Sequence, residues 1–74
     1  MTHGDFDPNH VFSHHAATPD KLARYEAIHD GAKHFAEVIL EQVPDCTDRT
    51  AVLQLLREAS MLACAAVSLD GRLK

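Results

Sequence analysis

The chain has 74 residues, of which 46% are hydrophobic and 24% charged; this composition is typical of one small globular domain and excludes a disordered segment. The net charge is −4 and the first Lys or Arg is Lys21, so we expect no long nucleic acid as a partner, whereas a small anion needs only a few basic groups. No apolar run reaches the roughly 18 residues of a membrane span and no signal-peptide pattern is present, so we expect a cytoplasmic protein without a membrane partner.

Residues 1–19 are expected to form a short irregular N-terminal arm, because they contain Gly4, Pro8 and Pro19 and show no regular apolar spacing. Four of the six histidines lie in this arm. The stretch VFSHH places Phe12 just before the adjacent pair His14 and His15. These three side chains are too polar as a group for a core, and they are candidates for contact with a ligand.

A first long helix is expected from about residue 19 to residue 43. Thr18 is the candidate N-cap, and Pro19 suits the first helical position because its missing N–H has no partner there in any case. Gly31 lies inside the helix at a cost of about 1 kcal/mol relative to Ala, which indicates either a close backbone neighbour or no constraint at all. Apolar residues recur at helical spacing along one stripe, which consists of Tyr25, Ile28, Ala32, Phe35, Ala36, Ile39 and Val43.

The chain is expected to turn at about residues 44–47, because the residue before Pro44 is driven out of the helical region. A second helix then runs from about 47 to 68, with Asp45 or Thr47 as its N-cap. So short a connection gives an antiparallel pair of helices. The expected fold is therefore all-α, with a helical hairpin over residues 20–74.

The second helix is apolar over more of its circumference than one partner helix covers. Its expected core stripe is interrupted by few polar residues, and from Ala59 the chain reads ASMLACAAV. A helix that is apolar on every side requires burial on every side, so we expect the chain to assemble into a compact homo-oligomer. The expected stripe consists of Val52, Leu55, Leu56, Ala59, Ala63 and Ala66.

Neither a metal centre nor an active site is predicted. The sequence has no His-Glu-x-x-His and no Cys-x-x-Cys motif, so its six histidines are read as scattered surface groups and no metal or cofactor is expected. Cys46 and Cys64 are expected to be free thiols, since on one helix they lie about 27 Å apart. Ser13 precedes His14, but no residue is placed to orient the histidine as a base, so no enzyme is expected.

Two groups of residues are candidates for binding a small anionic ligand. Tyr25, His29 and Lys33 follow at four-residue steps and offer a ring, an imidazole and a cation on one side of the first helix. The plainer interpretation is a core tyrosine flanked by exposed polar residues. Arg49 and Thr50 lie at the start of the second helix, where free backbone N–H groups attract anions, and the plainer interpretation there is capping.

The chain also resembles a known family over about residues 11–68. The run PDCTDRTAVLQLLREASMLACAAV is similar to the second helix of the phage cyclic-nucleotide sponges that defeat CBASS immunity, with the triplet Asp48-Arg49-Thr50 and an Ala-rich ending. Upstream, FSHH and RYEAIHDGAKHFAEVI are similar to the arm and the first helix of that family. The shared unit is the helical hairpin of anti-CBASS protein two and of the C-terminal part of the anti-Thoeris sponges.

The resemblance implies a compact oligomer, commonly a hexamer, that binds cyclic di- or trinucleotide signals and holds them without cleavage. It implies base stacking by Phe12 and Tyr25, a phosphate contact by Lys33, and a lid that includes His14 and His15. It also implies a second kind of site at Arg49 and Thr50. The sequence departs from the family pattern at His14, where Tyr is frequent, and at His29, where Arg is frequent, so two expected ligand contacts become imidazoles. Late in the second helix, Leu62 and Cys64 replace the Trp and Asn of the family.

Other functions stay open at this point. A helical hairpin that serves assembly alone explains the ASMLACAAV surface equally well, and a histidine-rich metal binder explains the arm. The preferred cyclic nucleotide, the number of pocket types and the exact oligomer number do not follow from the sequence.

Overall fold

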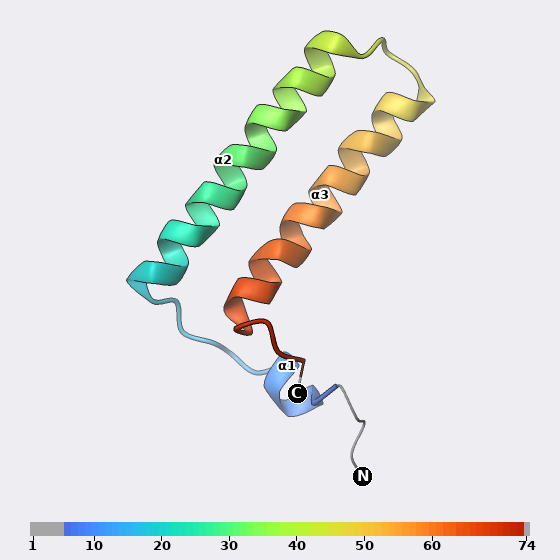
Figure 1. Cartoon of the computed structure of the whole chain (residues 1–74). Helices are drawn as coiled ribbons and strands as arrows, with labels where there is room; N and C mark the ends of the chain where they lie inside the picture. Colours follow the sequence, from blue (N-terminus) through green and yellow to red (C-terminus); the bar gives the residue numbers. More distant parts are fainter. Residues whose placement is uncertain (1–5, 74) are drawn as a thin grey trace.

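The computed structural model describes residues 6–73, which form helices joined by short connections (Figure 1). The helices are α1 (Pro8–Val11), α2 (Pro19–Gln42) and α3 (Thr47–Ser68). α2 and α3 lie antiparallel and side by side, and α1 lies beyond their open end, next to the C-terminal segment (Figure 1). The all-helical hairpin predicted from the sequence is confirmed.

The first long helix is capped by a side chain, and the second is not. The Thr18 hydroxyl accepts a hydrogen bond from the Lys21 N–H at 3.2 Å, so it satisfies one free donor of α2. The N-cap of α3 is Cys46, which makes no side-chain cap bond, so the expected caps Asp45 and Thr47 are wrong. The carboxylate of Asp45 instead pairs with Arg49 at 3.2 Å, which draws it away from the helix N–H groups.

The C-terminal end of α3 is closed by backbone hydrogen bonds. The Gly71 N–H donates to the Ala66 carbonyl at 2.8 Å, and the Asp70 N–H donates to the Val67 carbonyl at 3.2 Å. This is the Schellman arrangement, which requires left-handed backbone just past the helix end. Asp70 and Gly71 supply it with φ values of 55° and 73°.

The N-terminal arm is more ordered than the sequence indicates. Within the described part, residues 8–11 form the helix α1, with Asp7 as N-cap accepting from the Asn9 N–H at 3.0 Å. A helix of four residues is too short to show an apolar period, which is why the expectation of an irregular arm was wrong here. The arm is attached to the C-terminal segment, because the Asp7 N–H donates to the Leu73 carbonyl and a His10 ring nitrogen contacts the Leu69 carbonyl at 3.3 Å.

The contact between α2 and α3 forms a thin core. Of the described hydrophobic residues only Ile39 and Leu69 are buried, at 4% and 8% exposure. The remaining expected α2 stripe is half-buried except Phe35, which is 53% exposed. The α3 residues turned toward α2 are half-buried and consist of Leu53, Leu56, Ser60, Ala63 and Val67.

The expected α3 stripe is therefore wrong in part. Leu56 and Ala63 are half-buried as expected, but Val52, Leu55, Ala59 and Ala66 are exposed. Because α3 carries apolar side chains over more than half of its circumference, its periodicity does not single out the face that meets α2. Val52, Leu55, Leu62 and Ala66, with Ala59 between them, form an exposed row that we call the outer apolar face.

One chain alone exposes more surface than a compact monomer of its size. Its accessible area is 5784 Å², whereas a monomer of 8.2 kDa exposes about 4,500 Å². The radius of gyration is 15.7 Å, against about 11 Å for a compact domain of this length. α3 is long and apolar enough to cross a membrane, judged by its length and composition alone. This is weak evidence for a membrane span, because a helix that packs against other chains is equally apolar.

The two glycines at 31 and 71 are expected to respond oppositely to alanine. A Cβ at Gly31 meets nothing within 4 Å, so Gly31→Ala should raise the free energy of unfolding by about 0.5–1 kcal/mol through helix propensity. Gly71 has a φ of 73°, so Gly71→Ala should lower it by about 1 kcal/mol. Urea unfolding at fixed protein concentration measures both, and a loss of stability in Gly31→Ala would mean that something outside the chain approaches that backbone.

Candidate functional site

One long edge of the hairpin carries polar contacts in a regular register. The Tyr25 hydroxyl lies 2.6 Å from the Ser68 hydroxyl, and the His29 Nε2 lies 3.5 Å from the Cys64 Sγ. Each step of four residues along α2 is matched by a step of four back along α3, as an antiparallel pair requires. We call this row the polar edge. It brings together Tyr25, His29 and Lys33, which are the three α2 residues expected from the sequence.

The polar edge continues at Lys33 into a shallow hollow of about 230 Å³ between α2 and α3. Its wall also includes Arg57, a second cation that sequence reasoning did not single out. The signal was available, since Arg57 is the only Lys or Arg between residues 50 and 68. The two cations give the hollow a positive character suited to phosphate oxygens. The hollow is lined by Ala32, Lys33, Ala36, Leu53, Leu56, Arg57 and Ser60.

Lys21 joins the two helices where the arm begins. Its Nζ donates to the Ser68 carbonyl at 3.2 Å and lies 3.3 Å from the Asp70 carboxylate, and its side chain is only 15% exposed. The cation thereby satisfies one of the free carbonyls at the C-terminus of α3. Sequence reasoning missed this role. A positive charge in the first turn of a helix is unfavourable because that end of the helix dipole is also positive. The position of Lys21 in α2 therefore indicated that its ammonium group binds an acceptor outside that helix.

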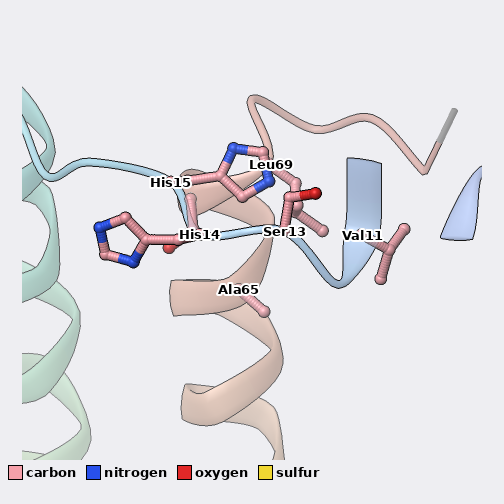
Figure 2. Close-up of a pocket in the computed structure, with 7 residues that line it drawn as sticks. Val11, Ser13, His14, His15, Ala65 and Leu69 are labelled. Carbon is pink, nitrogen blue, oxygen red and sulfur yellow. The ribbon is translucent and has the colours of Figure 1, made fainter. Parts of the chain in front are cut away.

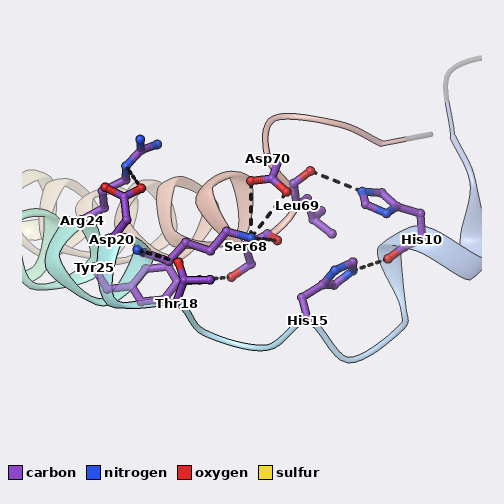
Figure 3. Close-up of polar contacts among 10 residues, drawn as sticks. His10, His15, Thr18, Asp20, Arg24, Tyr25, Ser68, Leu69 and Asp70 are labelled. Atoms are coloured by element: carbon purple, nitrogen blue, oxygen red, sulfur yellow. Dashed lines mark hydrogen bonds and ion pairs between the residues drawn. The ribbon is translucent and has the colours of Figure 1, made fainter.

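A second hollow of about 350 Å³ lies between the arm and the last turns of α3 (Figure 2). His14 and His15 both line it, and their rings point in different directions (Figure 2). A ring nitrogen of His15 lies 2.6 Å from the His10 carbonyl, and the His10 and His15 rings meet edge to face at 4.9 Å (Figure 3). The hollow is lined by Val11, Ser13, His14, His15, Ala65, Ser68 and Leu69.

Phe12 lies outside this hollow and is the most exposed large hydrophobic side chain among residues 6–73. It is 79% exposed, and its only described aromatic neighbour is Phe6, with ring centroids 6.0 Å apart. In one chain, therefore, the Phe12 ring has a face open to an external partner. Tyr25, the other expected stacking residue, lies on α2 and is half-buried.

Arg49 and Thr50 lie at the opposite end of the hairpin from the arm. The Arg49 guanidinium pairs with Asp45 at 3.2 Å and donates to the Val43 carbonyl at 3.4 Å. The Thr50 hydroxyl donates to the Cys46 carbonyl at 3.4 Å. α3 is about 33 Å long, so a single chain does not bring these two residues to the other six expected site residues.

The polar edge and the arm carry groups that suit a flat, anionic ligand. No group of three or more His, Cys, Asp or Glu side chains gathers among residues 6–73 in a way that would hold a metal ion. The polar edge and the arm instead present rings, imidazoles and cations on open surface. Such groups stack on flat rings and hold phosphates without altering them.

The comparison with known families agrees with this arrangement. The model of the Acb2/Tad1 hairpin domain matches residues 7–68. The chain belongs to the Acb2/Tad1 hairpin family. The match covers α1, α2 and α3 and includes all eight expected site residues, and it confirms the resemblance seen in the sequence. No curated protein and no solved structure matches the chain.

The Tyr25–Ser68 contact offers a test of the register of the hairpin. Tyr25→Phe and Ser68→Ala should each lower the free energy of unfolding by about 0.5–1.5 kcal/mol, because each removes one half of a part-buried hydrogen bond. In the double variant the losses should not add, and urea unfolding of all four proteins measures the coupling. Strictly additive losses would show that the two hydroxyls do not interact.

Proposed function

We propose that this member of the Acb2/Tad1 hairpin family binds and sequesters cyclic di- or trinucleotide second messengers without cleaving them. In a phage-infected bacterium it thereby blocks CBASS-type antiviral signalling in the host cytoplasm. The observation that carries the proposal is the family match over residues 7–68. The family is one of sponge domains, so the proposed role is non-enzymatic and needs no cofactor.

The chemistry of the described residues supports a ligand of this class. A cyclic dinucleotide presents two flat bases and two phosphates, so it needs rings to stack on and a few cations. Phe12 and Tyr25 are the stacking residues in this proposal, and Lys33 is the phosphate contact, assisted by Arg57 in the same hollow. His14, His15 and His29 are the polar contacts around the bases, and Arg49 and Thr50 belong to a second kind of site.

A single hairpin is too open to enclose such a ligand, so the proposal includes a homo-oligomer, with a hexamer as the expected form. The two hollows beside the expected site residues, of about 230 and 350 Å³, are shallow and share no lining residue, whereas a pocket for a small molecule encloses most of its surface. The outer apolar face supports assembly, since Leu55 and Leu62 are 63% and 71% exposed in one chain. Contact between copies covers that face and completes the ligand sites.

If copies of the chain contact one another through the outer apolar face, a charged residue placed on that face should lower the mass of the assembly. Leu55→Asp should convert the oligomer into monomers, because a buried unpaired carboxylate costs several kcal/mol at every copy of the contact. The matched control is Ala23→Asp, which adds the same charge at an exposed position of α2, on the side that carries Glu26 and Asp30. Light scattering after size-exclusion chromatography gives the masses. An unchanged mass for Leu55→Asp would place the contact elsewhere.

Sequestration is tested by native mass spectrometry of the protein with a panel of cyclic di- and trinucleotides and a cyclic ADP-ribose isomer. The expected result is an oligomer that retains one intact ligand type at fixed stoichiometry, with the same ligand mass after long incubation. Thermal melting with the retained ligand should show a shift that grows with its concentration. A cleaved ligand would contradict sequestration, and an oligomer that retains nothing would favour the hairpin as an assembly module alone.

Lys33→Gln should weaken binding of the retained nucleotide by about ten- to a hundredfold, because a hydrogen bond to a charged group contributes about 1.5–3 kcal/mol. The control Arg72→Gln removes one positive charge from the exposed C-terminal segment and should leave the affinity within about twofold. Isothermal titration calorimetry gives both values. Equal losses in the two variants would mean that only overall charge matters.

A further inference from the structure

His10 is a histidine of the arm to which the proposed function gives no role. Its Nε2 lies 3.3 Å from the carbonyl oxygen of Leu69, the C-cap residue of α3 (Figure 3). Because a carbonyl oxygen only accepts, the Nε2 of His10 carries a proton and is the donor. The Asp7 N–H also donates to the Leu73 carbonyl, so the arm is attached at two points to the segment that follows α3.

His10 also determines the surroundings of His15. The His15 Nε2 lies 2.6 Å from the His10 carbonyl oxygen, and the two rings meet edge to face (Figure 3). The Nε2 of His15 must be the donor here for the same reason as in His10. A neutral imidazole carries one proton, so this contact leaves the Nδ1 of His15 as an acceptor.

An acceptor on His15 restricts what that ring can hold. The ring lines the hollow of about 350 Å³ between the arm and α3, and its Nδ1 has no hydrogen-bond partner among residues 6–73. A phosphate diester oxygen only accepts a hydrogen bond, so it does not pair with this nitrogen. The ring N–H and amino groups of nucleotide bases are donors, and they do.

We propose that His10 is a positioning residue that sets the tautomer of His15, and that the Nδ1 of His15 accepts a hydrogen bond from a base N–H or amino group of the bound nucleotide. The base contact rests on the proposed function, whereas the tautomer does not. His10 acts through His15 and does not touch the ligand. Its ring holds the arm on the Leu69 carbonyl, which keeps the His10 carbonyl within reach of His15.

Nitrogen-15 NMR of the histidine rings tests the tautomer without any ligand. In mildly alkaline buffer, where imidazole is ordinarily neutral, His15 should show the Nε2–H tautomer alone, and that proton should exchange slowly with water. His10→Ala should speed the exchange at least tenfold and admit the other tautomer. His10→Gln should restore the slow exchange, because its amide again donates to the Leu69 carbonyl.

The matched control is His34→Ala, which removes an exposed histidine roughly 22 Å along α2 from the arm end and should leave the His15 signals unchanged. His15→Gln identifies those signals, and circular dichroism shows whether each variant keeps its helices. Fast exchange of the His15 proton in the wild type would overturn the proposal. So would slow exchange that survives His10→Ala.

The base contact is tested with cyclic di-AMP, cyclic di-GMP and cyclic GMP–AMP as probes. With a bound probe, His15 should remain neutral and its Nδ1 signal should move in the direction of a hydrogen-bonded acceptor. Isothermal titration calorimetry should show a five- to tenfold loss of affinity in His10→Ala, about the size of one neutral hydrogen bond, and recovery in His10→Gln.

A bound His15 that is protonated on both nitrogens would indicate a phosphate contact and overturn the proposal, as would an unchanged affinity in His10→Ala. If none of the three probes binds, the proposed function fails and the base contact fails with it. The ligand-free spectra still decide whether His10 positions His15, so the two failures are distinguishable.

Discussion

Two packed helices cover only one face of each other, and α3 is apolar on two faces. The side of α3 that meets α2 is half-buried, while Leu55 and Leu62 on the outer apolar face stay open in one chain. The excess of about 1,200 Å² over a compact monomer is comparable to the area that one specific interface buries. A thin core of this kind gives a lone hairpin little stability, so burial by further copies is the physical basis of the proposed oligomer.

The register between α2 and α3 decides which polar residues meet. Tyr25 opposite Ser68 and His29 opposite Cys64 share one offset, and the same offset sets Lys33 beside the region of Ser60 and Arg57. At the arm end, Lys21 ties α2 to the last carbonyls of α3 and to Asp70. A slip of one helical turn would separate all of these partners together, so the clasp at Lys21 also keeps the polar edge aligned.

The sequence predicts the hairpin well and its interior less well. Thr18-Pro19, Pro44 and Asp70-Gly71 are local signals, and each acts through backbone geometry that hardly depends on the rest of the chain. The face of α3 that meets α2 is a tertiary choice, and a helix with apolar residues nearly all round offers several. The expected α3 stripe therefore contained Val52 and Leu55, which are exposed, and omitted Leu53 and Val67, which are half-buried.

The same contrast holds for the site. The four-residue spacing of Tyr25, His29 and Lys33 predicts that they share one side of α2, and the described structure shows that row beside α3. The roles of Lys21, Arg57 and Cys64 depend on which α3 residues lie opposite, and one sequence does not give that pairing. The short helix α1 was missed because four residues show no period, although Asp7-Pro8 is an ordinary helix start.

The polar edge and the outer apolar face lie on opposite sides of the buried face of α3. At 100° per residue, Cys64 and Arg57 fall about 140–180° around the helix axis from Leu55, Ala59 and Ala66. A neighbour that covers the outer apolar face of one copy therefore does not cover the polar edge of that same copy. The proposed assembly and the proposed ligand contacts of α2 and α3 thus draw on different sides of α3 within one copy. This separation would let so short a chain carry both proposed properties without one displacing the other.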